Sequence, residues 1–209
     1  LTQCALVNGV WHAAGILGDA TLPKQDAPLL ACVYTPKALG AASIHTGVTG
    51  PLCTFALFSS AASLLGGAGQ ANYAAANACL DALAAWRQAH GASAVSIQWG
   101  AWASIGMAAR GAASARAEAM EKASGFGRIT LAEGLWVLRM AALPMRRARV
   151  FGCVPISWSQ LLGWQRNVPT FLSAFGLEGK PSHRNGQDQM MRESGSTSGA
   201  CIHLQNPKI

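Results

Sequence analysis

The chain has 209 residues, of which 51% are hydrophobic and 12% charged, enough to bury the core of one domain. Its basic residues give a formal net charge of +7 but are spread out, without the aromatic-interleaved stripe that favours nucleic-acid binding. The longest apolar runs are too short to cross a bilayer, and no basic segment precedes an apolar run as in a signal peptide. We therefore expect a cytoplasmic protein without nucleic-acid or membrane partners.

The six cysteines are widely spaced and include no C-x-x-C pair. A zinc site is therefore not expected, and no other metal site is either. Buried free thiols in a reducing compartment are the expectation. Because the chain begins at Leu1 and not at methionine, we expect a piece of a longer polypeptide.

The first part of the chain alternates between predicted strands and helices. Ala5 to Trp11 is an apolar run that predicts a buried strand running into a glycine-containing loop. Pro28 to Ser43 predicts a helix that Pro36 must break or kink. Leu52 to Phe58 predicts the second buried strand.

A long helix is predicted from Gln70 to His90, which contains no Gly or Pro and stops at Gly91. Ala94 to Trp99 predicts a third strand, closed by Gly100. We expect this alternation of strand and helix to form a parallel sheet covered on both faces, which is an α/β fold.

The rest of the chain is predicted to contain two more helices and one more strand. Ser104 to Ser124 is rich in small residues and predicts a mobile helical lid. Thr130 to Met140 predicts a helix, because Thr130 and Glu133 have the spacing of a capping box. Arg149 to Val154 predicts the last strand.

Small and polar residues follow the predicted strands, where open α/β sheets bind ligands. Those ends carry, in chain order, His12-Ala13-Ala14-Gly15, Ser59-Ser60 and Trp99-Gly100. Tyr73 lies one turn inside the long helix, and Asn77 shares its face four residues later. We expect Tyr73, Asn77 and a serine of the preceding strand to converge.

That grouping suits carbonyl reduction. A hydride that reaches a ketone leaves an alkoxide, which needs a proton and a hydrogen-bond donor. The pKa of a free tyrosine is about 10, and a neighbouring ammonium, which we expect from Lys37, would lower the pKa of Tyr73. The Ser60 hydroxyl can hold the carbonyl oxygen, and the Asn77 amide can organise water.

Each of these residues also has an ordinary structural explanation. A tyrosine on a buried helix is usually a core residue with a satisfied hydroxyl. Asn77 can bond to a loop and Ser60 can cap a turn, and a lysine such as Lys37 is more often solvated. His12 has no Asp, Glu or His close by in the sequence, which disfavours a role as base or metal ligand.

Five segments carry a known pattern in order: His12-Ala13-Ala14-Gly15, Phe58-Ser59-Ser60, Gly69-Gln70-Ala71-Asn72-Tyr73-Ala74-Ala75-Ala76-Asn77, Trp99-Gly100-Ala101-Trp102 with Gly106-Met107, and Ile156-Ser157-Trp158. They resemble the H-A-A-G, F-S-S, G-Q-x-x-Y-x-x-x-N, W-G-x-W with G-M, and D-W motifs of the ketoreductase domains of modular polyketide synthases. These domains belong to the short-chain dehydrogenase/reductase superfamily, and the resemblance runs from about Ala5 to Leu162.

The resemblance implies an NADPH-dependent reduction of a β-ketoacyl thioester to a β-hydroxyacyl thioester. Tyr73 would give the proton, Ser60 would hold the carbonyl, and Asn77 and Lys37 would complete a catalytic tetrad. The cofactor would contact His12, Ala13, Ala14, Gly15, Tyr73, Trp99 and Gly100.

Lys37 lies one residue closer to Tyr73 than the family pattern implies, with Pro36 at the expected position. We therefore expect a shortened loop around Gly47 to Pro51 to absorb the shift.

Three further positions would steer the substrate and the stereochemistry. Leu17-Gly18-Asp19 resembles the L-D-D segment of the class that gives the D-configured alcohol, and Asp19 keeps the last aspartate of that segment. Leu65 replaces the tryptophan typical of the opposite class, and Met107 lies in the G-M segment. The resemblance therefore favours the D-alcohol.

Reductases of this family hold the cofactor phosphates on a G-x-x-G-x-x-G loop, which these 209 residues lack. Gly66-Gly67-Ala68-Gly69 belongs instead to the segment before Tyr73. We therefore expect residues 1–165 to be the C-terminal half of a Rossmann-like doubly wound parallel sheet, lacking the N-terminal phosphate-binding βαβ unit. Residues 166–209 are expected to be a linker or disordered tail.

The expected partners follow from the resemblance. They are an acyl carrier protein that presents the substrate on its phosphopantetheine arm, and the other domains of a polyketide or fatty acid synthase, including an N-terminal half of the reductase. Two alternatives stay open: a truncated, non-catalytic remnant that packs against neighbouring domains, and a free-standing reductase of small carbonyls or fatty-acyl chains.

Overall fold

The computed structural model describes residues 7–48, 50–104, 125–143, 150–163 and 167–176, with the single residues 115 and 119. They form two compact units. One unit contains the described residues of Leu1–Gly100 and Thr130–Cys153, and the other contains those of Ala101–Ile129 and Val154–Ala200. The predicted helix over 104–124 lies almost wholly outside the described residues.

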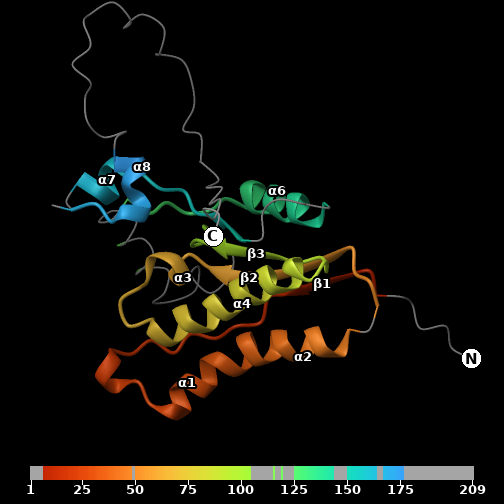
Figure 1. The fold of residues 1–209 in the computed structure, drawn as a ribbon. Coiled ribbons are helices and arrows are strands. Elements are labelled where there is room, and N and C mark those ends of the chain that lie inside the picture. Colours follow the sequence, from red (N-terminus) through yellow and green to blue (C-terminus); the bar gives the residue numbers. More distant parts are fainter. Residues whose placement is uncertain are drawn as a thin grey trace, which may run out of the picture. The chain divides into compact units, whose positions relative to one another are not determined.

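The first unit is built on a parallel sheet of four strands in the order β1-β2-β3-β4 (Figure 1). The strands are β1 (Gly9–His12), β2 (Thr54–Ser60), β3 (Val95–Trp99) and β4 (Val150–Cys153). The predicted parallel α/β fold is therefore confirmed. β2 continues two residues beyond the predicted end, so that Ser60 pairs with Trp99 at the carboxyl edge of the sheet.

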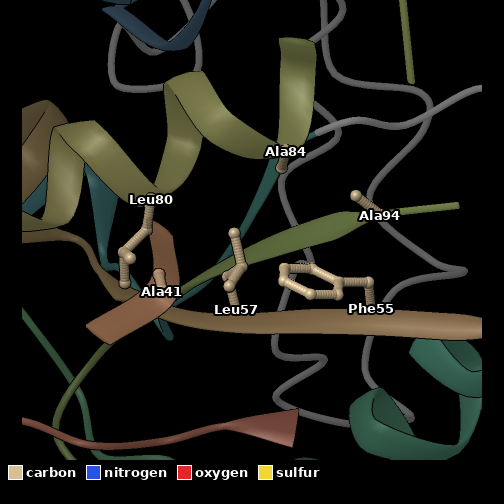
Figure 2. Packing of buried hydrophobic residues seen from close by; sticks show 6 residues of the cluster. All are labelled: Ala41, Phe55, Leu57, Leu80, Ala84 and Ala94. Atoms are coloured by element: carbon tan, nitrogen blue, oxygen red, sulfur yellow. The ribbon is translucent and has the colours of Figure 1, made fainter. Parts of the chain in front are cut away.

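One face of the sheet is covered by α2 (Gly40–Gly47) and the long helix α4 (Ala71–Ala89). Alternate residues of a strand point to the same face, and Phe55 and Leu57 of β2 point toward α4 (Figure 2). The buried cluster on this face consists of Ala41, Phe55, Leu57, Leu80, Ala84 and Ala94. This core fixes α4, and therefore Tyr73, against β2.

Pro36 does not break the helix in which it lies. α1 (Ala27–Tyr34) begins after Asp26, whose Oδ1 accepts a hydrogen bond from the Leu29 amide at 2.8 Å. The helix then continues into α2 through a π turn, η2 (Thr35–Leu39). Proline cannot donate a backbone hydrogen bond, and a π turn is a local departure from the α-helical pattern that often marks a functional site.

The opposite face of the sheet is covered by α6 (Leu131–Ala142) (Figure 1). The helix packs on β2, where the Thr54 hydroxyl donates to the Ala142 carbonyl at 3.3 Å. The predicted capping box is present, because Thr130 Oγ1 accepts from the Glu133 amide at 3.3 Å and Glu133 Oε2 accepts from the Thr130 amide at 2.8 Å.

The second unit contains short elements: α7 (Trp158–Gly163), η4 (Thr170–Leu172) and α8 (Ser173–Gly176). Trp158 of α7 stacks on Phe175 of α8 with ring centroids 4.2 Å apart. η4 and α8 lie within residues 166–209, for which the sequence predicted no regular structure.

Two surface properties of the described residues bear on the sequence predictions. No described helix is both long and apolar enough to span a membrane. Cys32 and Cys53 carry exposed free thiols and the free thiol of Cys79 is half-buried, so the expectation that the thiols are buried is wrong for Cys32 and Cys53. Cys32 lies on α1, of which only Val33 is buried, and Cys53 lies just before the first residue of β2.

Truncation of a core residue of α4 should destabilise the chain strongly. Leu80→Ala removes a fully buried side chain and should lower the free energy of unfolding in urea by about 3 kcal/mol. Leu135→Ala on α6 is the matched control, since that leucine is exposed and its truncation should change the free energy by less than about 1 kcal/mol. Equal losses in the two variants would contradict the assigned core.

Candidate active site

His12 closes β1 and is buried. Its Nε2 lies 2.9 Å from the Lys37 carbonyl oxygen, and because a carbonyl can only accept, Nε2 carries the hydrogen. Burial lowers the pKa of His12; the hydrogen bond to the Lys37 carbonyl raises it by less, and the nearby Lys37 charge lowers it further. The imidazole is therefore neutral and ties the end of β1 to the π turn. No sequence pattern predicts this role of His12.

Lys37 lies in the π turn and points inward, with 2% of its surface exposed. Its Nζ donates to the Phe58 carbonyl oxygen at 2.9 Å and lies 5.3 Å from the centroid of the Tyr73 ring. Burial lowers the pKa of Lys37 to about 8, while the Asp81 charge acts in the opposite direction. The ordinary explanation of a solvated lysine does not apply here.

The Lys37 side chain leaves no room for a side chain at position 15. A Cβ at position 15 would lie 2.8 Å from Lys37 Cε, closer than carbon atoms normally approach. The glycine of the H-A-A-G segment therefore makes room for the lysine stem. Ala13 and Ala14, which precede it, are exposed.

Tyr73 is buried in the first turn of α4. Burial raises the pKa of its phenol and the Asp19 charge adds to the rise, whereas hydrogen bonding to the side chains of Asn77 and Ser60 lowers it. The expectation of a lowered pKa is therefore wrong. The Lys37 ammonium lies over the ring face, and burial of the hydroxyl outweighs the hydrogen bonds, so the phenol stays protonated near neutral pH.

Asn77 and Ser60 are the two side chains whose hydrogen bonding lowers the pKa of Tyr73. Asn77 is fully buried, and its Nδ2 donates to the Tyr73 carbonyl at 2.8 Å. Its Oδ1 has no hydrogen-bond partner among the described residues. Ser60 Oγ accepts from the Ala62 amide at 3.2 Å, at the start of α3 (Ala62–Leu65). The serine does cap a turn, and its hydroxyl hydrogen is left to be donated to another oxygen.

The loop that contains Asp19 is bonded to the start of α4. Asn72 Nδ2 donates to the Gly18 carbonyl at 2.8 Å, and Gln70 Nε2 donates to Asp19 Oδ1 at 3.3 Å. These bonds hold Asp19 near enough to Tyr73 for its charge to act on the phenol. Leu65, at the end of α3, is half-buried, and Met107 lies outside the described residues.

The segment Gly66-Gly67-Ala68-Gly69 forms the turn between α3 and α4. Gly66 has φ 75° and ends α3, and Gly69 has φ 74° before α4. Such positive φ values favour glycine. Gly69 also approaches the Ala20 backbone, whose amide donates to its carbonyl at 2.9 Å. The segment is thus built to join two helices.

Trp99 is the last residue of β3, and Gly100 follows it. Trp99 is buried and its ring lies 5.6 Å from that of Phe58. Its carbonyl accepts from the Ala61 amide at 2.9 Å, and the Gly100 amide donates to the Cys153 carbonyl at 2.9 Å. Among the described residues, no cluster of metal-binding side chains is present.

Comparisons with known proteins show which sequences and structures this chain is similar to. A family model described as "KR domain" matches residues 2–104. Over 153 residues, 72% of the chain, the sequence is 46% identical to the phthioceranic/hydroxyphthioceranic acid synthase of Mycobacterium tuberculosis. Over 99 residues, 47% of the chain, it is 52% identical to polyketide synthase GfsA of Streptomyces halstedii. The matched regions are 7% and 1% of those two proteins.

The solved structures to which the chain is similar include ketoreductases of polyketide synthesis. A structure of A-type ketoreductases from a modular polyketide synthase superposes with a TM-score of 0.72 at 28% identity, covering 82% of this chain and 36% of that one. A ketoreductase from the first module of phoslactomycin biosynthesis in Streptomyces sp. HK803 gives 0.69 at 33% identity, covering 78% and 37%. The chain therefore spans little more than a third of these ketoreductases.

The buried ammonium of Lys37 should make stability depend on pH. The pKa of Lys37 falls from 10.5 to about 8 on folding, so between these values the unfolded chain binds a proton that the folded chain does not, and stability rises with pH. Urea unfolding of wild type and Lys37→Met should show wild type gaining about 2 kcal/mol relative to the variant between pH 7.5 and 9.5.

The exposed Lys24 gives the control for removal of a lysine. Lys24→Met should change the free energy of unfolding at pH 7.5 by less than about 1 kcal/mol. A difference between wild type and Lys37→Met that stays constant from pH 7.5 to 9.5 would contradict the burial of the Lys37 ammonium.

Proposed function

Because the chain belongs to the KR domain family of polyketide synthases, we propose that it supplies the catalytic half of a β-ketoacyl reductase. The observation that carries the proposal is the convergence of Tyr73, Ser60 and Lys37 at the carboxyl edge of one parallel sheet. A phenol, a hydroxyl and an ammonium are the groups that a reduced ketone oxygen needs.

The residues have separate tasks in the proposed reaction. Ser60 donates its free hydroxyl hydrogen to the ketone oxygen and orients it. Tyr73, whose raised pKa keeps it protonated near neutral pH, transfers its proton to that oxygen as the carbon is reduced. Lys37 stabilises the tyrosinate that remains, and the buried Asn77 Oδ1, unpartnered in the described residues, accepts from a water that returns the proton. The keto group thus becomes a hydroxyl group.

The cofactor that the family implies is NADPH, which supplies a hydride to the keto carbon when bound. The residues present fit its reactive end: we propose that His12, Ala13, Ala14, Gly15, Tyr73, Trp99 and Gly100 line the nicotinamide. They do not fit its phosphates, since the glycine-rich loop with positive φ joins α3 to α4. The phosphates would be held by an N-terminal half of the domain.

An N-terminal half would also complete the sheet. β1 is an edge strand of the described sheet, and Trp11 on it is exposed. An open edge beside an exposed aromatic side chain supports a further strand at this position. The reductase half would span residues 1–165, and the short helices η4 and α8 would lie in the linker that follows.

The substrate would be a β-ketoacyl group on the phosphopantetheine arm of an acyl carrier protein, within a cytoplasmic synthase for polyketides or fatty acids. The net charge of +7 is suited to an acidic carrier surface. Asp19, which acts on the Tyr73 phenol, would steer the substrate together with Leu65 and Met107 toward the D-configured alcohol.

Replacement of the proposed proton donor should abolish reduction. In the chain complemented with an N-terminal ketoreductase half, Tyr73→Phe should lower kcat for a β-ketoacyl thioester at least about a hundredfold, followed by the loss of NADPH absorbance. The chain contains only one other tyrosine, and Tyr34, whose hydroxyl lies 2.7 Å from Cys79 Sγ, gives the matched control.

Tyr34→Phe should keep wild-type turnover, and both variants should keep the far-UV circular dichroism of the parent. Turnover retained in Tyr73→Phe would remove Tyr73 from its role. No turnover in any form, with NADPH bound, would favour a non-catalytic remnant.

A further inference from the structure

A second polar cluster lies beneath the proposed active site, on the face of the sheet that α4 covers. Its centre is Asp81, two helical turns after Tyr73 on α4. The carboxylate accepts hydrogen bonds from Ser63 Oγ at 2.7 Å, Ser96 Oγ at 2.6 Å and Gln98 Nε2 at 2.9 Å. One carboxylate therefore joins α3, β3 and α4.

The positions of these partners are unusual for their surroundings. Ser96 and Gln98 are buried in β3 on the side that faces α4, where a parallel sheet normally carries apolar side chains. Burying a polar side chain costs free energy unless it is hydrogen-bonded. Two polar residues at such positions are accounted for if they serve to hold the carboxylate between them.

Ser63 connects the carboxylate to the turn that carries Ser60. Ser63 Oγ lies 2.8 Å from the Ser60 carbonyl oxygen and 2.7 Å from Asp81 Oδ2, and it accepts from Gln98 Nε2 at 2.9 Å. A hydroxyl has a single hydrogen, so Ser63 donates to one of the two oxygens at a time. Gln98 has two hydrogens and serves both Ser63 and Asp81.

Lys37 lies against the helix that carries Asp81: its Nζ is 5.3 Å from the centroid of the Tyr73 ring, and Asp81 follows Tyr73 by two turns of α4. The titratable groups that contact Lys37 or whose charge acts on it are His12 at the end of β1 and Tyr73 and Asp81 on α4, and the Asp19 charge acts on the Tyr73 phenol. Of these, Asp81 is the one that raises the pKa of Lys37, against the effect of burial.

We propose that Asp81 is a positioning residue of the reductase: its carboxylate holds the Ser60 turn and the Tyr73 helix against β3, and its negative charge stabilises the buried ammonium of Lys37. The part that concerns catalysis rests on the proposed function. The part that concerns Lys37 does not, because it can be measured on the chain alone.

The test is the titration of Lys37 in the full chain, followed by NMR of ¹³C-labelled lysine. The chain has five lysines, and Lys37→Arg identifies the resonance. In Asp81→Asn, which keeps the shape and removes the charge, the Lys37 midpoint should move to lower pH. In Ser96→Ala, which removes one hydrogen bond to Asp81 and keeps the charge, the midpoint should stay where it is in wild type.

A second measurement needs no substitution at Asp81, so it stays informative even if Asp81→Asn fails to fold. Loss of the Lys37 proton removes a positive charge, so the ¹³Cγ resonance of Asp81, one of four aspartates, should show a step at the Lys37 midpoint that is absent in Lys37→Met. An unshifted Lys37 midpoint in folded Asp81→Asn, or no step in Asp81 of wild type, would overturn the proposal.

The catalytic part has its own readout in the complemented domain. The alkaline limb of the kcat profile should move to lower pH in Asp81→Asn and stay unchanged in Ser96→Ala. A lack of activity in the wild-type complemented domain would refute the proposed function and leave the Lys37 result standing. A normal profile in an active Asp81→Asn enzyme would refute the positioning role alone.

Discussion

The burial of one ammonium group organises the carboxyl edge of this sheet. Lys37 extends from a π turn, places its charge against the Phe58 carbonyl and over the Tyr73 ring, and requires a glycine at position 15. Desolvating an ammonium is expensive, and the surrounding structure offsets that cost with a carbonyl, an aromatic face and a carboxylate charge. These contacts explain why β1, β2 and α4 meet as they do at this edge of the sheet.

The site is assembled from local irregularities that regular elements hold in place. The π turn presents the Lys37 carbonyl to the neutral His12, and the loop with positive φ at Gly66 and Gly69 turns the chain from α3 into α4. The core of α4 and β2 is regular and apolar (Figure 2). The positions of the site residues therefore depend on packing a few residues away.

Much of this arrangement could be predicted from the sequence, because the signals were local. The spacing of Tyr73 and Asn77, the glycine-free helix and the capping box at Thr130 each identify their element without knowledge of the fold. The π turn, the hydrogen bond of His12 and the direction of the Tyr73 pKa could not be predicted. Each depends on burial and on contacts between distant segments, which neither spacing nor composition encodes.

The central claim is that this chain holds the reacting groups of a ketoreductase and depends on a separate half for the cofactor phosphates. An NADPH fluorescence titration of the purified chain, before and after addition of an N-terminal ketoreductase half, tests it most directly. We predict no saturable binding by the chain alone and saturable binding after complementation. Binding by the chain alone, or none in the complemented domain, would contradict the claim.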